Sequence, residues 1–497
     1  MDTFQLLMGG FGTVLQPTNL LFALLGCVLG TMVGVLPGVG PSAATAILIP
    51  VTMAMNPTAA IIMLAAIYYG AMYGGTITSV LLNVPGEAAS VVTCLDGYEM
   101  AKRGRAGPAL AIAAIGSFIG GSVATIGLVL VAMPLTRFAL SFGPPEFFAL
   151  MVMGLSMVIG LAGRSLPRAL TSAILGLLLA QIGIDLVTGA PRFTFGRMEL
   201  LDGFGIVPVV MGLFGIGEIL LNAEAKATQI FDAKMKSLIL SRKDIKDSAW
   251  PIVRGTFLGF FVGLIPGVGA IVPTYLSYAV EKRMSKTPER FGTGAIEGVA
   301  GPETTNNAYA NAALIPLFTL GIPGNATTAI LMGALMMNGL IPGPMLFTEH
   351  PQFIWAVIAS FFVGNLILLI LNLPLIPIWV ALLKIPYSIL LTLVMGFCVV
   401  GAYSLSSSVF DVGAMLGFGI LGYVFKKLDI PTAPLVLTLI LGPLMERGLR
   451  QSLEMSRGDF SIFFSRPLSA TLLAIAVLVI ITSTVSALAP VKGADNV

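Results

Sequence analysis

Long apolar runs alternate with short polar or Pro-Gly-containing stretches along this chain of 497 residues. Runs such as 107–133, 352–382 and 468–488 reach the roughly 17–25 residues that a helix needs to cross the hydrocarbon core of a bilayer. Only 10% of the residues are charged, whereas a soluble domain carries about 25%. The pattern predicts an all-α polytopic membrane protein with about 10–12 membrane segments.

Two interruptions of the apolar pattern share one sequence. The segment Gly34–Gly40 (GVLPGVG) recurs 229 positions later as Gly263–Gly269 (GLIPGVG). Proline and paired glycines cannot continue an α-helix. At membrane depth, such a break is tolerated only where the freed backbone groups line a protein-enclosed cavity. Matching breaks in two halves of a chain therefore point to the binding site of a transporter.

The similarity between the halves continues beyond these breaks. Leu82–Ser90 aligns with Leu320–Thr328 at an offset of 238, and Val152–Gly154 aligns with Val394–Gly396 at an offset of 242. We predict an internal duplication. Its parts are a first transmembrane repeat at 1–222, a cytoplasmic linker at 223–250, a second repeat at 251–455, and a C-terminal transmembrane helix and tail at 456–497.

Basic residues indicate which way each half faces, because Lys and Arg concentrate in cytoplasmic loops. The loop 52–58 precedes every Lys and Arg of the chain, whereas its counterpart 281–286 contains three of them. One step later the relation reverses, since 102–105 is basic and its counterpart 338–342 is uncharged. The halves are thus predicted to be inverted-topology repeats. In this scheme four arginines fall on the external side: Arg447, Arg450, Arg457 and Arg466.

Short helical arms flank the repeated break. Residues 252–265 would span ~22 Å at 1.5 Å per residue, which is less than the ~30 Å of a hydrocarbon core. The segment 252–283 is therefore predicted to be a re-entrant helical hairpin, and 20–55 its mirror image from the other face. After each hairpin, one helix is expected to break at Pro85-Gly86 or Pro323-Gly324 and then continue.

The remaining composition excludes several classes of protein. The net charge of +3 is small and spread over loops, which argues against nucleic-acid binding. Three isolated cysteines (Cys27, Cys94 and Cys398) and one histidine, His350, are too few for a zinc site or a His-based catalytic site. We expect no metal site and no cofactor other than a coupling cation.

The helix N-termini that follow the breaks are candidates for substrate binding, because their free N–H groups and the helix dipole favour an anion. Four such N-termini are expected to converge, most of them followed by small hydroxyl or amide side chains, and no Lys or Arg lies in either hairpin tip. Helix packing of these Ser and Thr residues is the alternative. The predicted substrate-binding residues are Pro37, Gly38, Gly40, Ser42, Thr45, Pro85, Gly86, Ser90, Pro266, Gly267, Gly269, Pro323, Gly324, Asn325, Thr327 and Thr328.

A second group of polar residues lies within apolar surroundings. The segment 301–311 is unusually polar and is expected to have no close counterpart in the first half, where the nearest stretch is 73–79. Amide, hydroxyl and carbonyl oxygens are ligands for Na⁺, and a buried acid such as Glu87 usually marks a proton or ion path. Interhelical hydrogen bonding, or capping of its own helix by Glu87, is the alternative. The predicted ion-coupling residues are Glu87, Thr76, Thr78, Glu303, Thr304, Asn306 and Asn307, while Tyr68, Tyr69 and Tyr73 are expected to pack.

With these motifs the chain resembles the large membrane subunit of the tripartite tricarboxylate transporters, the TctA-like subunit. The resemblance covers nearly the whole chain and rests on the segments 34–41, 73–79, 83–87, 95–98, 263–269, 301–308 and 321–325. It implies a multi-pass protein of a bacterial inner membrane that works with a small membrane subunit and a periplasmic binding protein. It also implies secondary, ion-driven import of small di- and tricarboxylates such as citrate.

Two other functions stay open at this point. A membrane-embedded enzyme would need paired acids, a His-metal cluster or a Ser-Lys dyad on one helical face, and the sequence pattern indicates none. A passive anion channel would carry a flux that no ion gradient drives uphill. An ion-coupled importer, with Na⁺ or H⁺ as the coupling cation, accounts best for the paired breaks.

Overall fold

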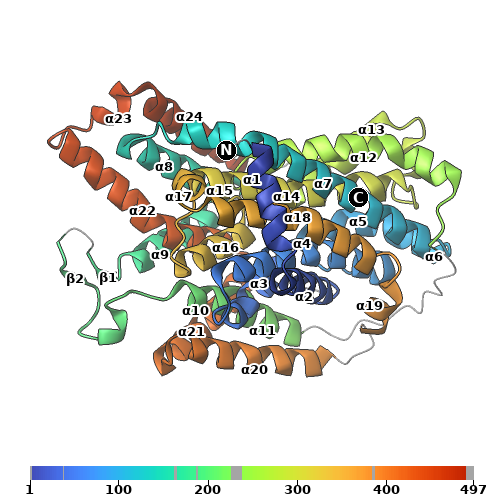
Figure 1. Ribbon diagram of the computed structural model, residues 1–497, viewed down its shortest axis with the longest axis horizontal. Helices are drawn as coiled ribbons and strands as arrows, with labels where there is room; N and C mark the ends of the chain where they lie inside the picture. Colours follow the sequence, from blue (N-terminus) through green and yellow to red (C-terminus); the bar gives the residue numbers. More distant parts are fainter. Residues whose placement is uncertain are drawn as a thin grey trace. The chain divides into compact units, whose positions relative to one another are not determined.

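The computed structural model describes residues 3–36, 39–161, 165–185, 188–224, 238–382 and 387–488. Most of these residues are helical, and Figure 1 shows the helices coloured along the sequence. The sheet within this described part pairs two short antiparallel strands, β1 (Gly183–Ile184) and β2 (Pro191–Arg192). The predicted all-α class is therefore confirmed.

Seven of the described helices are long and apolar enough to cross a membrane. Several further apolar helices have only 10–17 residues, the length expected of segments that enter the hydrocarbon without crossing it. The seven long segments are Pro17–Gly34, Pro57–Leu82, Ala106–Ala139, Ile206–Ala223, Pro351–Leu371, Val409–Lys427 and Pro467–Val485.

The chain divides into two compact units. The first comprises 1–140, 207–265 and 269–423, and the second comprises 141–206, 266–268 and 424–497. The first unit thus contains both Pro-Gly-broken helices and nearly all of both predicted hairpins. These packing units cut across the predicted repeats, whose boundaries and inverted orientation stay predictions.

The first hairpin and the first broken helix open the first unit. The helices α2, α3 and α4 each begin with a proline. Proline is well suited to the first helical position, where its missing N–H would have no intrahelical partner. The elements are α1 (Thr3–Val14), α2 (Pro17–Gly34), α3 (Pro41–Thr52), α4 (Pro57–Leu82), η1 (Ala88–Ser90), α5 (Val91–Thr93), η2 (Cys94–Tyr98), α6 (Glu99–Lys102) and α7 (Ala106–Ala139).

The second hairpin and the second broken helix follow in the same unit, with α12 and α13 side by side (Figure 1). The elements are α12 (Arg242–Gly263), α13 (Ile271–Met284), η5 (Pro288–Arg290), α14 (Glu297–Ala312), α15 (Leu314–Leu320), α16 (Ala326–Met337), α17 (Pro344–Glu349) and α18 (Pro351–Leu371). The other helices placed mainly here are α10 (Ile206–Val210), η4 (Met211–Ile216), α11 (Gly217–Ala223), α19 (Ile376–Leu382), α20 (Tyr387–Ser406) and α21 (Val409–Lys427).

The start of α12 differs from the expected arm at 252, since the helix begins inside the segment predicted as linker. Ser241 and Asp244 form a reciprocal capping box, in which each side chain accepts a hydrogen bond from the other residue's amide, at 3.1 and 3.0 Å. Such a box satisfies donors at the helix end. The cap therefore starts α12 ten residues before the expected arm, within a polar part of the sequence.

Two rows of glycines pack the hairpins against the broken helices. A Cβ on any of these glycines would lie less than 3.0 Å from α4 or α14. Successive glycines are four residues apart, so each row lies on one helix face. The glycines of the two rows contact residues of α4 and α14 that are equivalent at the offset of 238. For example, Gly30 contacts Ile67 and Gly259 contacts Thr305, as expected of a duplicated chain. The rows are Gly26, Gly30 and Gly34 on α2, and Gly255, Gly259 and Gly263 on α12.

The second unit packs α22 against α8 and α9, and α24 against α8. Its last helix, α24, agrees with the C-terminal segment expected near 468–488. The elements of this unit are α8 (Pro144–Leu161), α9 (Leu166–Ala180), β1, β2, η3 (Met198–Leu200), α22 (Ala433–Met455), α23 (Ile462–Ser465) and α24 (Pro467–Leu488).

Candidate functional site

The first broken helix leaves its axis between Leu82 and Ala88. α4 ends at Asn83, whose φ of 56° cannot continue the helix. Glu87 caps the turn that follows, since its Oε2 accepts a hydrogen bond from the Ala89 amide at 2.8 Å. Beyond it the chain forms a 3-10 turn, one α turn and a π turn rather than one continuous α-helix. Gly86 is packed so closely against Gly34 and Gly75 that a Cβ there would overlap them.

The second broken helix has the same plan. α15 ends at Gly321, whose φ is 71°, and α16 begins after Asn325. The Asn325 Oδ1 accepts a hydrogen bond from the Thr328 amide at 2.9 Å, and the Thr328 hydroxyl accepts one from the Asn325 amide at 2.9 Å. Asn325 Oδ1 and the Thr328 hydroxyl therefore cap α16. The side-chain NH2 group of Asn325 is left to contact another helix.

The hairpins contact the broken helices of the opposite half. Ser42 Oγ in the first turn of α3 lies 2.8 Å from Thr327 Oγ1 in the first turn of α16. Correspondingly, α13 of the second hairpin contacts η1 and α5. The structure thus brings together the N-termini of α3 and α16, two of the four that were predicted to converge.

Most of the remaining predicted substrate residues lie in the breaks themselves. Pro37 and Gly38 fall outside the described residues. Gly40 is the N-cap of α3, while Pro85, Pro323 and Gly324 lie in the two broken helices. Pro266, Gly267 and Gly269 lie in the connection between α12 and α13, where the φ values of 86° at Gly267 and 66° at Gly269 favour glycine.

Glu303 forms the centre of a buried polar cluster between α4, α5 and α14. Its Oε2 accepts a hydrogen bond from Thr76 Oγ1 at 2.6 Å, and its Oε1 accepts one from Thr93 Oγ1. Its side chain is 1% exposed. Two hydroxyl donors satisfy this carboxylate in part, but they do not neutralise its charge.

Glu87 is the second buried acid of this region. Besides capping its own turn, it accepts a hydrogen bond through Oε1 from Asn306 Nδ2 at 2.9 Å. Asn306 lies three residues after Glu303 on α14, so the Glu87 carboxylate contacts the turn of α14 that carries Glu303. The capping considered for Glu87 and the interhelical hydrogen bonding considered for the segment 301–311 are therefore both present.

Neither acid has a cationic partner in the part of the chain that the structure describes, where the ion pairs of Lys and Arg involve other carboxylates. Three nearby amide oxygens are also buried without a hydrogen-bond partner: Asn306 Oδ1, Asn307 Oδ1 and Asn311 Oδ1. Two uncompensated acids beside unpartnered oxygens form an environment that a small cation would stabilise.

The two halves place different side chains at equivalent positions of this site. At the offset of 238, Tyr68 corresponds to Asn306 and Glu87 corresponds to Asn325. The contact of Glu87 with Asn306 therefore has a counterpart in that of Asn325 with Tyr68, where Asn325 Nδ2 donates to the tyrosine hydroxyl at 3.1 Å. Each acid has an uncharged equivalent in the other half, Asn325 for Glu87 and Ala65 for Glu303, so the duplicated frame carries one charged centre near α14.

This equivalence gives the polar segment 301–311 a counterpart at 63–73 of α4, where no close counterpart was expected from the sequence. Asn307 then corresponds to Tyr69, and Asn311 to Tyr73. Asn307 donates to Ser117 at 2.7 Å, while the Tyr69 hydroxyl donates to the Ser360 carbonyl at 3.5 Å. The tyrosines are buried, as expected of packing residues, but their hydroxyl groups also join the polar contacts between helices.

Three predicted residues make hydrogen bonds within their own helices. The hydroxyl of Thr45 donates to Pro41 O, that of Thr78 to Gly75 O, and that of Thr304 to Ala300 O. Such bonds satisfy the hydroxyl locally. For Thr45, Thr78 and Thr304 the packing interpretation is thus the simpler one.

Other residues of the site were not among those predicted. Thr93 binds Glu303, and Ser79 donates to Ser90 at 2.9 Å. Ser117 accepts from Asn307 and comes from α7, more than 180 residues away in sequence. The polarity of Ser79 and Thr93 within apolar stretches was the available signal, but their partners depend on how the helices pack.

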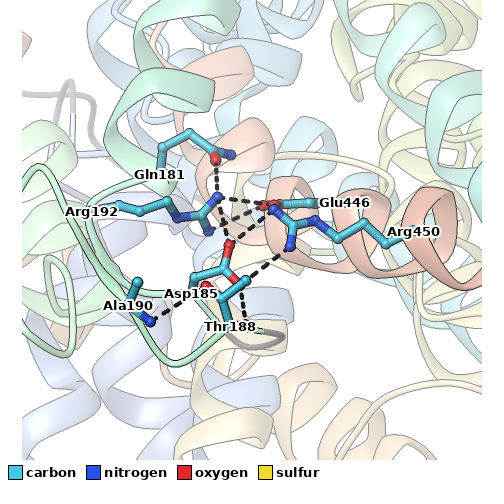
Figure 2. A network of polar contacts seen from close by, with 7 residues as sticks. All are labelled: Gln181, Asp185, Thr188, Ala190, Arg192, Glu446 and Arg450. Carbon is cyan, nitrogen blue, oxygen red and sulfur yellow. Dashed lines mark hydrogen bonds and ion pairs between the residues drawn. The ribbon is translucent and has the colours of Figure 1, made fainter.

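A separate ion-pair network lies within the second unit, between the β1–β2 hairpin and α22 (Figure 2). Arg192 donates to Glu446 Oε1 at 2.9 Å and to Gln181, and Arg450 donates to Asp185 Oδ2 at 2.9 Å. Arg450 also lies 2.7 Å from Glu446. Arg450, one of the arginines placed on the external side, is therefore charge-paired, and so is Arg466 with Glu146 at 2.5 Å.

The arrangement combines groups that favour anions with groups that favour cations. Among the described residues, no group of three His, Cys, Asp or Glu side chains could hold a metal ion. Hydroxyls and helix N-termini at the Ser42–Thr327 contact favour an anion, while the Glu87–Glu303 cluster favours a cation. Secondary transporters bind the substrate and the coupling ion at discontinuous helices of this kind.

Two proteins of Agrobacterium vitis are similar to this chain. A protein of Agrobacterium vitis described as an uncharacterized 52.8 kDa protein in the TAR-I ttuC' 3' region is 46% identical over 476 residues, which cover 96% of this chain and 95% of that protein. A second protein of that organism, described as uncharacterized in the TAR-II ttuC' 3' region, is 46% identical over 223 residues, or 45% of this chain and 92% of its own length.

No solved structure matches the chain. The model of the tripartite tricarboxylate transporter TctA family matches residues 20–437. This range contains both hairpins, both broken helices and the two buried acids. The chain therefore belongs to the tripartite tricarboxylate transporter TctA family, as a multi-pass membrane component of such a transporter.

Proposed function

We propose that this protein is a secondary active importer of small di- and tricarboxylates, such as citrate, driven by a gradient of Na⁺ or H⁺. It would act in a bacterial inner membrane with a small membrane subunit and receive its substrate from a periplasmic binding protein. The observation that supports ion coupling most strongly is the pair of buried acids, Glu87 and Glu303, which lie at or beside the first break and have no basic partner among the residues that the structure describes.

The carboxylate substrate is assigned to the side of the Ser42–Thr327 contact. There the N-termini of α3 and α16 meet, and their amides and hydroxyls can bind an anion without a lysine or arginine. Such neutral donors cost less to desolvate than a buried cationic side chain and release the anion more easily.

The coupling cation is assigned to the cluster of Glu87, Glu303, Thr76 and Asn306. A cation there would offset the charge of the acids, whose burial is otherwise unfavourable. The cluster and the substrate side are connected through α4 and α14, because Asn306 binds Glu87 at the first break while Tyr68 binds Asn325 at the second. Occupation of one break would thus change the environment of the other.

The two alternative functions receive less support. An enzyme would need a nucleophile, a base and a third group that orients the base, whereas the family model that matches the chain describes a transporter family. A passive anion channel gives no reason for buried acids. The absence of a P-loop sequence (GxxxxGK) is consistent with transport driven by an ion gradient.

The direct test is uptake of labelled citrate into proteoliposomes that contain this protein and its small partner, with the binding protein present. Uptake is compared with and without an inward Na⁺ gradient, and then with an inward H⁺ gradient. Accumulation that requires one of these gradients is expected. Equal equilibration under all conditions would favour a channel and would contradict the proposal. If citrate is not taken up, a ligand screen of the binding protein identifies the carboxylate with which to repeat the test.

A further inference from the structure

A small cavity lies beside the Glu303 cluster, between α4, α7 and the end of α18. It has a volume of about 10 Å³ and is lined by Tyr73, Thr76, Ser117 and Asn372, together with apolar residues of α4, α7 and α19. That volume is close to the minimum that holds one water molecule. A space of this size with several polar groups on its wall is suited to a water molecule or a small cation.

Asn372 gives the cavity an unused acceptor. The residue ends α18 and is 4% exposed. Its Nδ2 donates to the Leu368 carbonyl at 3.0 Å, but its Oδ1 has no partner. A buried amide oxygen without a partner is unfavourable, so a ligand in the cavity would stabilise this arrangement.

Two cavity residues also touch Glu303 itself. Thr76 donates to the Glu303 carboxylate at 2.6 Å, and Ser117 Oγ lies 3.4 Å from the Glu303 carbonyl. Ser117 further accepts the hydrogen bond of Asn307, whose Oδ1 is unpartnered. The cavity is therefore separated from the buried acid by a single hydroxyl side chain.

Two of the four polar lining residues, Thr76 and Asn372, have apolar residues at the equivalent places of the other half, whereas Tyr73 corresponds to Asn311 and Ser117 to Ser360. At the offset of 238, Thr76 corresponds to Leu314. The segments that begin with Ser117-Phe118 in α7 and Ser360-Phe361 in α18 align at an offset of 243, and this pairs Asn372 with Val129. The combination of Thr76 and Asn372 thus occurs once in the duplicated chain, on the side where α18 ends and α7 begins.

We propose that this cavity is an access chamber through which a small monovalent cation moves between Glu303 and the side of the membrane that carries the loop 102–105. That loop is the basic one predicted to be cytoplasmic, and α7 starts directly after it. The inference rests on the proposed ion-coupled function and adds the route by which the ion leaves. Asn372 coordinates the cation through Oδ1. The Thr76 hydroxyl, which contacts the Glu303 carboxylate, is the next ligand on the way to that acid.

Accessibility of position 372 to Ag⁺ tests the chamber without requiring transport. In a variant in which Cys27, Cys94 and Cys398 are replaced by alanine, Asn372→Cys is compared with Asn365→Cys. Asn365 is equally buried and polar but does not line the cavity. Free thiols remaining after brief exposure to Ag⁺ are counted by maleimide labelling of the SDS-unfolded protein. We expect the Asn372→Cys thiol to react about tenfold faster or more, because thiol reactivity follows access. Equal rates would overturn the proposal.

Uptake by a second pair of variants tests whether the chamber is used. Asn372→Leu fills the cavity and removes the oxygen, whereas Asn338→Leu changes the same type of helix-end amide, which donates to Ala334 O at 2.8 Å, away from any cavity residue. We expect gradient-driven uptake to fall about tenfold only in Asn372→Leu, with both proteins folded by size-exclusion chromatography. Normal uptake in Asn372→Leu would contradict the proposal. Loss of gradient dependence in the unmodified protein would instead refute the proposed function, while the Ag⁺ comparison would still decide whether the chamber exists.

Discussion

Glu87 makes two contacts that one substitution can separate. Its Oε2 caps the turn at Ala89, and its Oε1 accepts from Asn306. Glutamine keeps an acceptor for one contact but carries no charge for a cation. We predict that Glu87→Gln raises the cation concentration at half-maximal uptake about tenfold or more, since interactions with a charged group contribute about 1.5–3 kcal/mol. Initial uptake rates over a series of Na⁺ concentrations and pH values measure this change.

The matched control is Glu349→Gln, which removes an exposed carboxylate at the end of α17. It should leave the cation dependence unchanged. If Glu87→Gln lowers only the melting temperature in detergent and keeps the normal cation dependence, Glu87 acts as a helix cap and not as a coupling group.

The sequence contains enough information to predict the residues at the breaks, but not their partners. Pro85, Gly86 and Glu87 stand out because proline and glycine end helices and a carboxylate is rare in an apolar run. Thr93 and Ser117 bind the acid or its neighbour, yet many other Ser and Thr residues share their local pattern. Their role depends on which faces of α5, α7 and α14 meet, and periodicity alone does not determine that.

Glycine rows set the distance between the hairpins and the broken helices, and Gly30 tests this at the scale of one helix pair. A Cβ at Gly30 would lie 2.5 Å from the Ile67 carbonyl oxygen of α4. We predict that Gly30→Ala destabilises the protein by about 1–3 kcal/mol through overpacking. The measurement is the melting temperature in detergent. Gly12→Ala in α1 is the control, because nothing lies within 4 Å of a Cβ there. If both variants melt alike, close packing at Gly30 is not important.

The cap of α12 gives a pH dependence at the scale of the element. Burial alone would raise the pKa of Asp244, but hydrogen bonds from Ser241 and Arg105 hold it below its usual value. The Arg105 guanidinium lies 2.5 Å from the carboxylate. A lowered pKa in the folded state stabilises the protein above the unfolded value, about 3.9, and this contribution is lost as the pH falls through the folded value.

We therefore expect Asp244→Asn to lower the melting temperature at neutral pH and to have less effect near pH ~3, below the ordinary carboxylate pKa. Melting curves of both proteins between these conditions measure the difference. Asp247→Asn, a nearby acid on the same helix, is the control. A constant difference between the wild-type protein and Asp244→Asn at all pH values would show that the charge of Asp244 does not contribute.

At the scale of the whole molecule, the membrane-protein class and the two broken helices follow from the sequence, whereas the packing units do not. Repeats predict which segments are equivalent, but α2 packs on α4 and α12 on α14 within one unit that takes helices from both halves. The early start of α12 also escaped prediction, because a polar helix outside the hydrocarbon has the composition of a linker.

The inverted orientation of the halves can be tested by the sides on which four loop residues lie. Counterpart loops carry Asn56 in the first half and Lys286 in the second, and the next pair carries Lys102 and Asn338. In a cysteine-free protein, single substitutions to cysteine at these positions are labelled in intact cells with an impermeant maleimide. We predict labelling at Asn56→Cys and Asn338→Cys, and labelling of Lys102→Cys and Lys286→Cys only after permeabilisation, since basic loops stay cytoplasmic. A parallel duplication would place Asn56 and Lys286 on the same side. That result would contradict the inversion and with it the assignment of the two breaks to one site reached from opposite faces.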